Sequence, residues 1–279
     1  MLIKWETERG SLELRDPFRL RTTEGLGVQG VIVNMESAPY QDGAYLTDTL
    51  FEPRMVSLEV IVFGNNAQQA ERRRRLAKLF NPKLDGTLTV TADDGNVYRL
   101  QGRAEEVTFP ARIGRSASPS HQMAMISIIA PDPYFVGEDY QLVLQAISGG
   151  WSFPFLFNIA WGEVEKFRDI NNTGDVPVPI FITAHGAITN FTVQNVTTGE
   201  TIEIVMVIEE GERLEIDTGE KTVYLVETDG TRVNAFPNLS IDSTLFLLKP
   251  GKNVISYSVD VEGAGAGVTF AYKLRYVGI

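Results

Sequence analysis

Residues 55–63, MVSLEVIVF, are followed directly by residues 64–82, GNNAQQAERRRRLAKLFNP. The first stretch is rich in β-branched residues and predicts a strand, whereas the second carries helix formers between asparagine and proline. Asp93-Asp94-Gly95-Asn96 is typical of a hairpin turn, because glycine readily takes a positive φ. Further strands of similar composition are expected at Val28–Met35, Thr87–Thr91, Val97–Thr108 and Gln122–Ile129.

One helix is expected in this half of the chain, over Asn66–Asn81. Asn65 or Asn66 can cap its start, and Pro82 stops it. Its apolar side chains are few and fall on one narrow face, which we expect to lie on a sheet. The residues of that expected face are Ala70, Ala77 and Phe80, with Leu76 adjacent.

The second half of the chain is again rich in short strands, with turn signals between them and almost no helical pattern. This spacing is typical of an antiparallel sandwich or barrel. Pro131, Pro133 and Gly137 interrupt regular structure between the halves, and we place two domains at 1–135 and 136–279. The strands expected in the second domain are Gln141–Ala146, Val178–Thr183, Phe191–Val196, Glu200–Ile208, Arg213–Asp217, Thr222–Glu227, Leu245–Leu248, Asn253–Val259 and Val268–Tyr276.

Charge is divided unevenly along the 279 residues, whose formal net charge is −11. Residues 1–136 hold 16 basic and 17 acidic side chains, whereas residues 137–279 hold 9 and 19. The acidic second half repels nucleic acid and anionic membranes, so we expect no sequence-specific nucleic-acid partner and no membrane partner. The start, MLIKWE, lacks an apolar signal sequence, and no apolar run is long enough to cross a bilayer. We therefore expect a soluble protein made in the cytoplasm.

Several classes of chemistry are excluded by the residues present. The chain has no cysteine and two histidines, His121 and His185, which fall in different expected domains. Zinc-thiolate sites, cysteine nucleophiles and histidine-rich metal sites are therefore excluded, and no Walker, GxGxxG, HExxH or GxSxG motif is present. Carboxylates cluster beside Gly211, at Glu209, Glu210, Glu212 and Glu215, but they read as a solvated acidic loop. We expect no catalytic residue, no cofactor and no metal.

The sharpest charge feature is Arg72-Arg73-Arg74-Arg75. Consecutive helical residues point all round the helix, so at least one arginine must lie near the packed side and needs a partner, for which we expect a carboxylate. Three interpretations are open: a solvated helix face, a contact with an acidic neighbouring subunit, or a contact with DNA.

Aromatic residues alternate with others at Trp151, Phe153, Phe155 and Phe157, and Trp161 extends the pattern beyond Ile159. In an extended strand the four would project from one face, where they could stack on a sugar. Four exposed large aromatic side chains would favour aggregation, so we favour a face that covers or builds a core.

Several short segments of the sequence, taken in order, resemble those of the siphophage distal tail protein family. The first half ends in Ala130-Pro131-Asp132-Pro133-Tyr134-Phe135, and the second opens on the aromatic stretch Trp151–Phe157. Asn171–Asp175, Asn195–Gly199 and Leu248–Asn253 follow. The resemblance covers essentially the whole chain. It implies a mostly β protein, with an N-terminal tail-tube-like β-sandwich carrying one helix and a C-terminal galectin-like or carbohydrate-module-like sandwich.

The resemblance also implies a role in assembly. N-terminal domains of the family form a hexameric ring around the DNA channel, while C-terminal domains point outward. The ring joins the tail tube protein to a tail-associated hub or lysin protein, and in some phages it carries receptor-binding proteins. We therefore expect a structural hub in the virion tail tip, not an enzyme. The alternative is a carbohydrate-binding protein that contacts the host cell surface.

Overall fold

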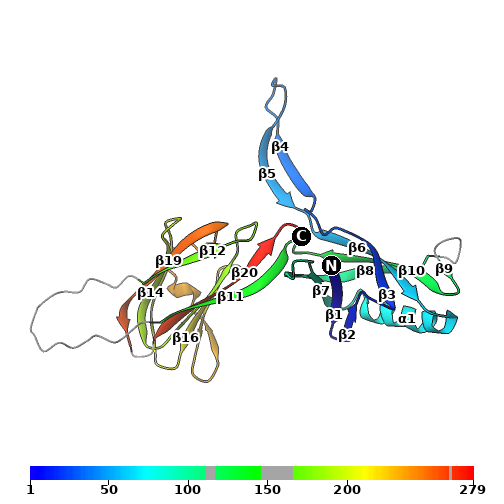
Figure 1. The fold of residues 1–279 in the computed structure, drawn as a ribbon. Helices are drawn as coiled ribbons and strands as arrows, with labels where there is room; N and C mark the ends of the chain where they lie inside the picture. The colour runs from blue at the N-terminus through cyan, green and yellow to red at the C-terminus, as the bar shows by residue number, and fades with distance from the viewer. Residues whose placement is uncertain (111–116, 146–165, 264–265) are drawn as a thin grey trace, which may run out of the picture. The chain divides into compact units, whose positions relative to one another are not determined.

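The computed structural model describes residues 1–110, 117–145, 166–263 and 266–279. These residues form two compact units, the first made of residues 1–138 and 276–279 and the second of residues 139–275. Each unit has its own hydrophobic core. Strands dominate both units, so the mostly β fold predicted from the sequence is confirmed (Figure 1).

The first unit is built on an antiparallel sheet with the strand order β3-β6-β10-β8-β7-β1-β2. Two further strands pair with it, β9 with β10 and the start of β11 with β8. Its elements are β1 (Leu2–Thr7), β2 (Gly10–Glu13), β3 (Phe18–Glu24), β6 (Arg54–Phe63), α1 (Asn66–Leu79), β7 (Asp85–Thr91), β8 (Val97–Thr108), β9 (Ala117–Ser118), β10 (His121–Ala130) and β11 (Phe135–Gln145).

Strand β6 shows how the sequence builds this sheet. Val56, Leu58, Val60 and Val62 are buried in alternation, because successive side chains of a strand point to opposite faces. The hairpin predicted between β7 and β8 is confirmed: Gly95 has a φ of +90° inside the turn.

Helix α1 begins as predicted, with a capping box. Asn65 Oδ1 accepts a hydrogen bond from the amide of Gln68, and Gln68 Oε1 accepts one from the amide of Asn65. The face expected to pack, however, is partly wrong. Gln69, Leu76 and Leu79 are buried, whereas Ala70 and Ala77 are exposed. The reason is that Gln69 donates to the carbonyls of Gly64 and Ser118, which turns the polar Gln69 inward instead of the alanines.

Two strands of the first unit leave its sheet. β4 (Val31–Glu36) and β5 (Tyr45–Phe51) pair only with each other among the described strands. Figure 1 shows them as a hairpin that projects away from β6 and β8. We call residues 28–52 the arm.

The second unit is a two-sheet antiparallel sandwich. One sheet has the order β18-β17-β16-β13-β20 and the other the order β12-β19-β14-β15. Both sheets contribute to one core, in which Ile182, Phe270, Phe191 and Ile204 are fully buried. The strands are β12 (Lys166–Asn172), β13 (Ile180–His185), β14 (Ile188–Asn195), β15 (Glu200–Ile208), β16 (Arg213–Asp217), β17 (Thr222–Val226), β18 (Arg232–Asn234), β19 (Gly251–Glu262) and β20 (Gly267–Tyr276), with a short 3-10 turn at Phe236–Asn238.

The strand expected at Leu245–Leu248 is wrong. Residues 245–247 are irregular, and Leu248 forms one isolated bridge with Val178. A single bridge satisfies the Leu248 backbone, because its amide and carbonyl both bond to Val178.

Buried asparagines join the three family-like polar segments of the second unit. Asn172 donates to the carbonyls of Val176 and Leu248, and Asn195 donates to Asn253 Oδ1 at 3.2 Å. Asn253 itself donates to the carbonyls of Lys249 and Gly251. These hydrogen bonds stabilise the turns of three segments, and each buried side-chain amide is satisfied. The segments are Asn171–Asp175, Asn195–Gly199 and Leu248–Asn253.

Candidate functional site

The arm exposes large apolar side chains on both of its strands. Every residue of β4 is exposed, and Met35 and Leu46 retain 64% and 66% of their full exposure. Val31, Ile32, Val33, Tyr45 and Leu50 are also exposed. A two-stranded hairpin is at best marginally stable in water by itself, and contiguous exposed apolar surface marks interaction sites. The arm is therefore our candidate functional site.

The base of the arm is closed by local contacts. The amide of Glu52 donates to the carbonyl of Gly30 at 3.1 Å, which joins the two ends of the hairpin. The ring of Phe51, the last residue of β5, meets Tyr134 edge-on with centroids 5.7 Å apart. Tyr134 belongs to the Pro-Asp-Pro-Tyr-Phe motif, so this motif packs against the base of the arm.

Arg54, the first residue of β6, organises the surroundings of this base. Its side chain is buried, and its guanidinium donates hydrogen bonds to four carbonyl oxygens. Two belong to Gly25 and Gly27, in the segment that leads into the arm, at 2.7 and 2.6 Å. The others belong to Pro133 and, at 2.7 Å, to Val277. The Arg54 side chain thus connects the segment before the arm, the Pro-Asp-Pro-Tyr-Phe motif and the C-terminal residues.

The charge of Arg54 is held without a carboxylate among these partners. Burial lowers the pKa of the guanidinium from its ordinary value, although arginine stays protonated in proteins. Its five N–H donors suit several converging carbonyls, and its planar face lies over the ring of Phe135. Arg54 was not among the residues singled out from the sequence. The one signal was a lone arginine between a proline and an apolar strand.

The arginine run divides between the chain's own fold and its surface. Arg72 Nη1 donates to the carbonyl of Phe63, and the Arg75 guanidinium lies 5.8 Å from the centroid of Phe18. The expected inward-facing arginine is thus Arg72, but its partner is a backbone carbonyl instead of the predicted carboxylate. Arg74 is exposed, and Arg73 is half-buried.

The carboxylates beside Gly211 do not converge on a site. Glu209, Glu210 and Glu212 lie in or beside the exposed turn between β15 and β16. Glu215 lies on β16, where it forms ion pairs with Arg213 at 2.8 Å and Arg232 at 2.7 Å.

The remaining candidates from the sequence are two histidines and one aromatic stretch. His121 lies in the first unit, with Nδ1 2.8 Å from Ser118 Oγ, and His185 lies in the second. Trp151, Phe153, Phe155, Phe157 and Trp161 lie outside the described residues.

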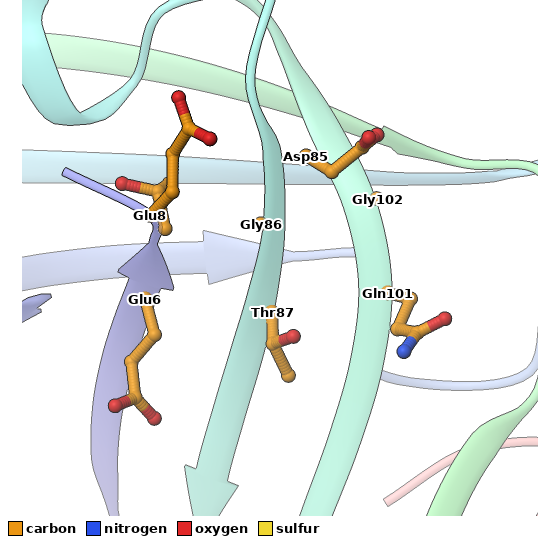
Figure 2. A pocket seen from close by; sticks show the side chains of 8 residues that line it. Glu6, Glu8, Asp85, Gly86, Thr87, Gln101 and Gly102 are labelled. Carbon is orange, nitrogen blue, oxygen red and sulfur yellow. The ribbon is translucent and has the colours of Figure 1, made fainter. Parts of the chain in front are cut away.

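A shallow hollow on the first unit is lined by the acidic residues Glu6, Glu8 and Asp85 (Figure 2). Figure 2 shows the side chains of Glu6 and Glu8 pointing away from each other. Asp85 is engaged by Arg103, whose hydrogen bond lowers the pKa of that carboxyl. In the part of the chain that the structure describes, no three acidic, histidine or cysteine side chains are placed to hold a metal ion.

Two protein families match the chain, in the order of its units. Residues 10–116 match the phage tail protein RIFT-related domain, and residues 173–276 match the siphovirus-type tail component, C-terminal domain. No curated protein sequence matches the chain significantly. Within the described residues, no helix has the length and apolar character needed to cross a membrane.

One solved structure extends the likeness to the whole chain. The Dit protein of phage SPP1, described as a paradigm of the hub adsorption apparatus in phages that infect Gram-positive bacteria, is similar over 98% of both chains. Its TM-score is 0.72 at 15% identity, so the likeness shows a shared fold. A chain of the phage P2 baseplate in its activated conformation with calcium matches 97% of both chains, with a TM-score of 0.48 at 11% identity.

Proposed function

Because this chain belongs to the siphophage distal tail protein family, we propose that it is the structural hub of a phage tail tip. The family resemblance read from the sequence is confirmed by the matches to both halves of the chain. The chain is thus a siphovirus-type tail component.

In this proposal, copies of the first unit form a closed ring, with six as the expected number, around a channel through which DNA passes. The tail tube protein binds one face of the ring, and a tail-associated hub or lysin protein binds the other. Receptor-binding proteins attach at the periphery. The protein is made in the host cytoplasm and functions in the virion, at the tail tip.

The exposed arm is the main support for this proposal. A ring needs a heterologous contact, in which one patch of a subunit meets a different patch of the next. Apolar side chains of the arm such as Ile32 and Leu46 are exposed and belong to neither hydrophobic core of the described chain. Burial of about 25 cal/mol per Å² of apolar surface would stabilise a contact with a neighbouring subunit.

Edge strands offer a second means of contact between subunits. Strands β2 and β3 end the sheet of the first unit, and each pairs with one neighbour among the described strands. Unpaired backbone groups at such edges can pair with another chain. The near-neutral first half avoids repulsion where subunits crowd, whereas the acidic second half suits domains that point outward.

We propose no catalytic role. The carboxylates considered as an acid–base pair lie in an exposed turn or in ion pairs and do not converge on one another, whereas hydrolysis needs two carboxyl groups that flank the bond to be cleaved. Loss of turbidity of a peptidoglycan suspension on addition of the purified chain would contradict this.

The test is the mass of the full chain in solution, measured by light scattering across a range of concentrations. The arm can be removed cleanly, because the Glu52–Gly30 hydrogen bond holds its ends together. A Gly-Gly link in place of residues 31–51 should leave a folded monomer, whereas the wild-type chain should form a discrete oligomer. The point variant Ile32→Ser/Leu46→Ser should weaken the oligomer with the arm still present. Equal masses for wild-type and armless chains would contradict the proposal.

A further inference from the structure

Helix α1 presents a broad outer face that its own core does not use. Its buried residues are Gln69, Leu76 and Leu79. The exposed face follows the three- and four-residue spacing of one side of a helix and comprises Ala67, Ala70, Arg74, Ala77 and Lys78. The short alanine side chains leave the helix surface open to close approach, with cationic side chains around them.

This face carries positive charge that no described residue neutralises. Arg72 and Arg75 make contacts within the first unit: Arg72 donates to the Phe63 carbonyl, and Arg75 lies over the Phe18 ring. In the described part of the chain, Arg73, Arg74 and Lys78 form no ion pair within 4.0 Å. One acidic residue, Glu71, lies on the same helix. The outer face of α1 therefore attracts a negatively charged partner.

The arm has the opposite charge. Residues 28–52 contain four carboxylates, Glu36, Asp42, Asp48 and Glu52, and neither lysine nor arginine. Glu36 ends β4 and Asp48 lies on β5, and both are exposed among the apolar side chains of the arm. Within the described chain these carboxylates also lack an ion pair.

We propose that the acidic, apolar arm of one copy lies along the basic outer face of α1 in the next copy. This rests on the proposed self-assembly and identifies the partner surface of the arm. The two patches differ and are complementary, as a heterologous contact that closes into a ring requires. A second copy explains both unneutralised patches at once, whereas a nucleic acid would explain α1 and leave the arm without a partner.

Two charge-reversed full-length chains test this contact. The helix variant is Arg74→Glu/Lys78→Glu, and the arm variant is Glu36→Lys/Asp48→Lys. Neither should assemble alone, because arm and helix then carry the same sign. In an equimolar mixture, the acidic arm of the helix variant meets the basic helix of the arm variant, and the reverse. Mixing should therefore restore the wild-type mass, with the two chains alternating.

A matched control reverses two exposed cations elsewhere on the first unit, Arg9→Glu/Arg99→Glu, with the same change in net charge. It should assemble as the wild type does. Circular dichroism establishes that every variant is folded.

We expect light scattering to show at least a tenfold weakening of assembly at physiological salt for each reversed chain, and recovery to within about threefold in the mixture. Normal assembly of the helix variant would overturn the α1 contact, while an armless monomer would leave the ring proposal standing. A mixture that fails to recover, or a control that fails equally, also overturns the contact. A wild-type chain that stays monomeric would overturn the ring proposal and the contact together.

Discussion

The guanidinium carbon of Arg54 lies 4.6 Å from the centroid of the Phe135 ring. The ring covers one face of the cation while its N–H groups donate to four carbonyls around it. The Pro-Asp-Pro-Tyr-Phe motif therefore has a structural role at the base of the arm. Pro133 accepts from Arg54, Tyr134 packs against the arm at Phe51, and Phe135 lies under the cation.

Replacing Arg54 by leucine should destabilise the first unit by about 3 kcal/mol or more, because four carbonyls around this buried side chain lose their donor at once. Arg54→Lys should recover part of this loss, since ammonium has three donors where guanidinium has five. Chemical denaturation gives the free energy of unfolding, and hydrogen exchange should rise in peptides that cover residues 25–54. The exposed Arg99→Leu is the control. A cost for Arg54→Leu no larger than that of the control would contradict the role assigned to this side chain.

Gly86 should tolerate no larger side chain, because Trp5 covers it. A Cβ at residue 86 would lie 2.2 Å from Trp5 Cζ2, and Trp5 is fixed by its stacking on Phe80 at 5.2 Å and by its hydrogen bond to Leu79. Gly86→Val should cost about 2–3 kcal/mol of unfolding free energy through overpacking. Gly27→Ala, which meets nothing within 4 Å, should leave the denaturation midpoint nearly unchanged. Equal midpoints for the two variants would refute the packing described.

Asn253 should be the most sensitive of the polar residues in the second unit. Asn253→Ala removes two donated hydrogen bonds, to Lys249 and Gly251, and two accepted ones, from Lys249 and Asn195. Because the buried Asn195 loses its acceptor and the Lys249–Gly251 turn loses its donor, we expect a loss of about 2–4 kcal/mol. Thermal unfolding measures it, with the exposed Gln194→Ala on β14 as the control. A change in melting temperature no larger than that of Gln194→Ala would mean that the turns hold without this network.

The arginine run should separate into two classes when each residue is changed to alanine. Arg72→Ala should lower the unfolding free energy by about 1 kcal/mol, because it removes a hydrogen bond to Phe63. Arg74→Ala, in contrast, should change it by less than about 0.5 kcal/mol, as is usual at the surface. Denaturant titration of the monomeric armless chain makes the comparison without assembly. Equal costs at both positions would show that the run acts as one unit.

Local signals in the sequence predict much of the fold. Asn65 and Pro82 bracket α1, and Gly95 marks the hairpin between β7 and β8, because capping and turn formation depend on a few adjacent residues. The packed face of α1 was only partly predicted, since Gln69 is buried by hydrogen bonds to Gly64, just before the helix, and to Ser118, 49 residues further along the chain.

The arm and its base lay beyond prediction from the sequence. Val28–Met35 predicted a strand, and β4 lies there, but nothing distinguishes an apolar strand that will be exposed from one that will be buried. Strand β5, YLTDTLF, was not expected, because its polar residues weaken the pattern. The role of Arg54 depends on carbonyls as far away in sequence as Val277, so only the folded chain reveals it.

Negative-stain imaging of the purified full-length chain, at the concentration where light scattering shows its largest mass, tests the proposed ring directly. We expect closed rings with an open centre and six-fold symmetry, and we expect no rings from the armless chain. Single compact particles at every concentration, or open chains that never close, would contradict the proposed ring.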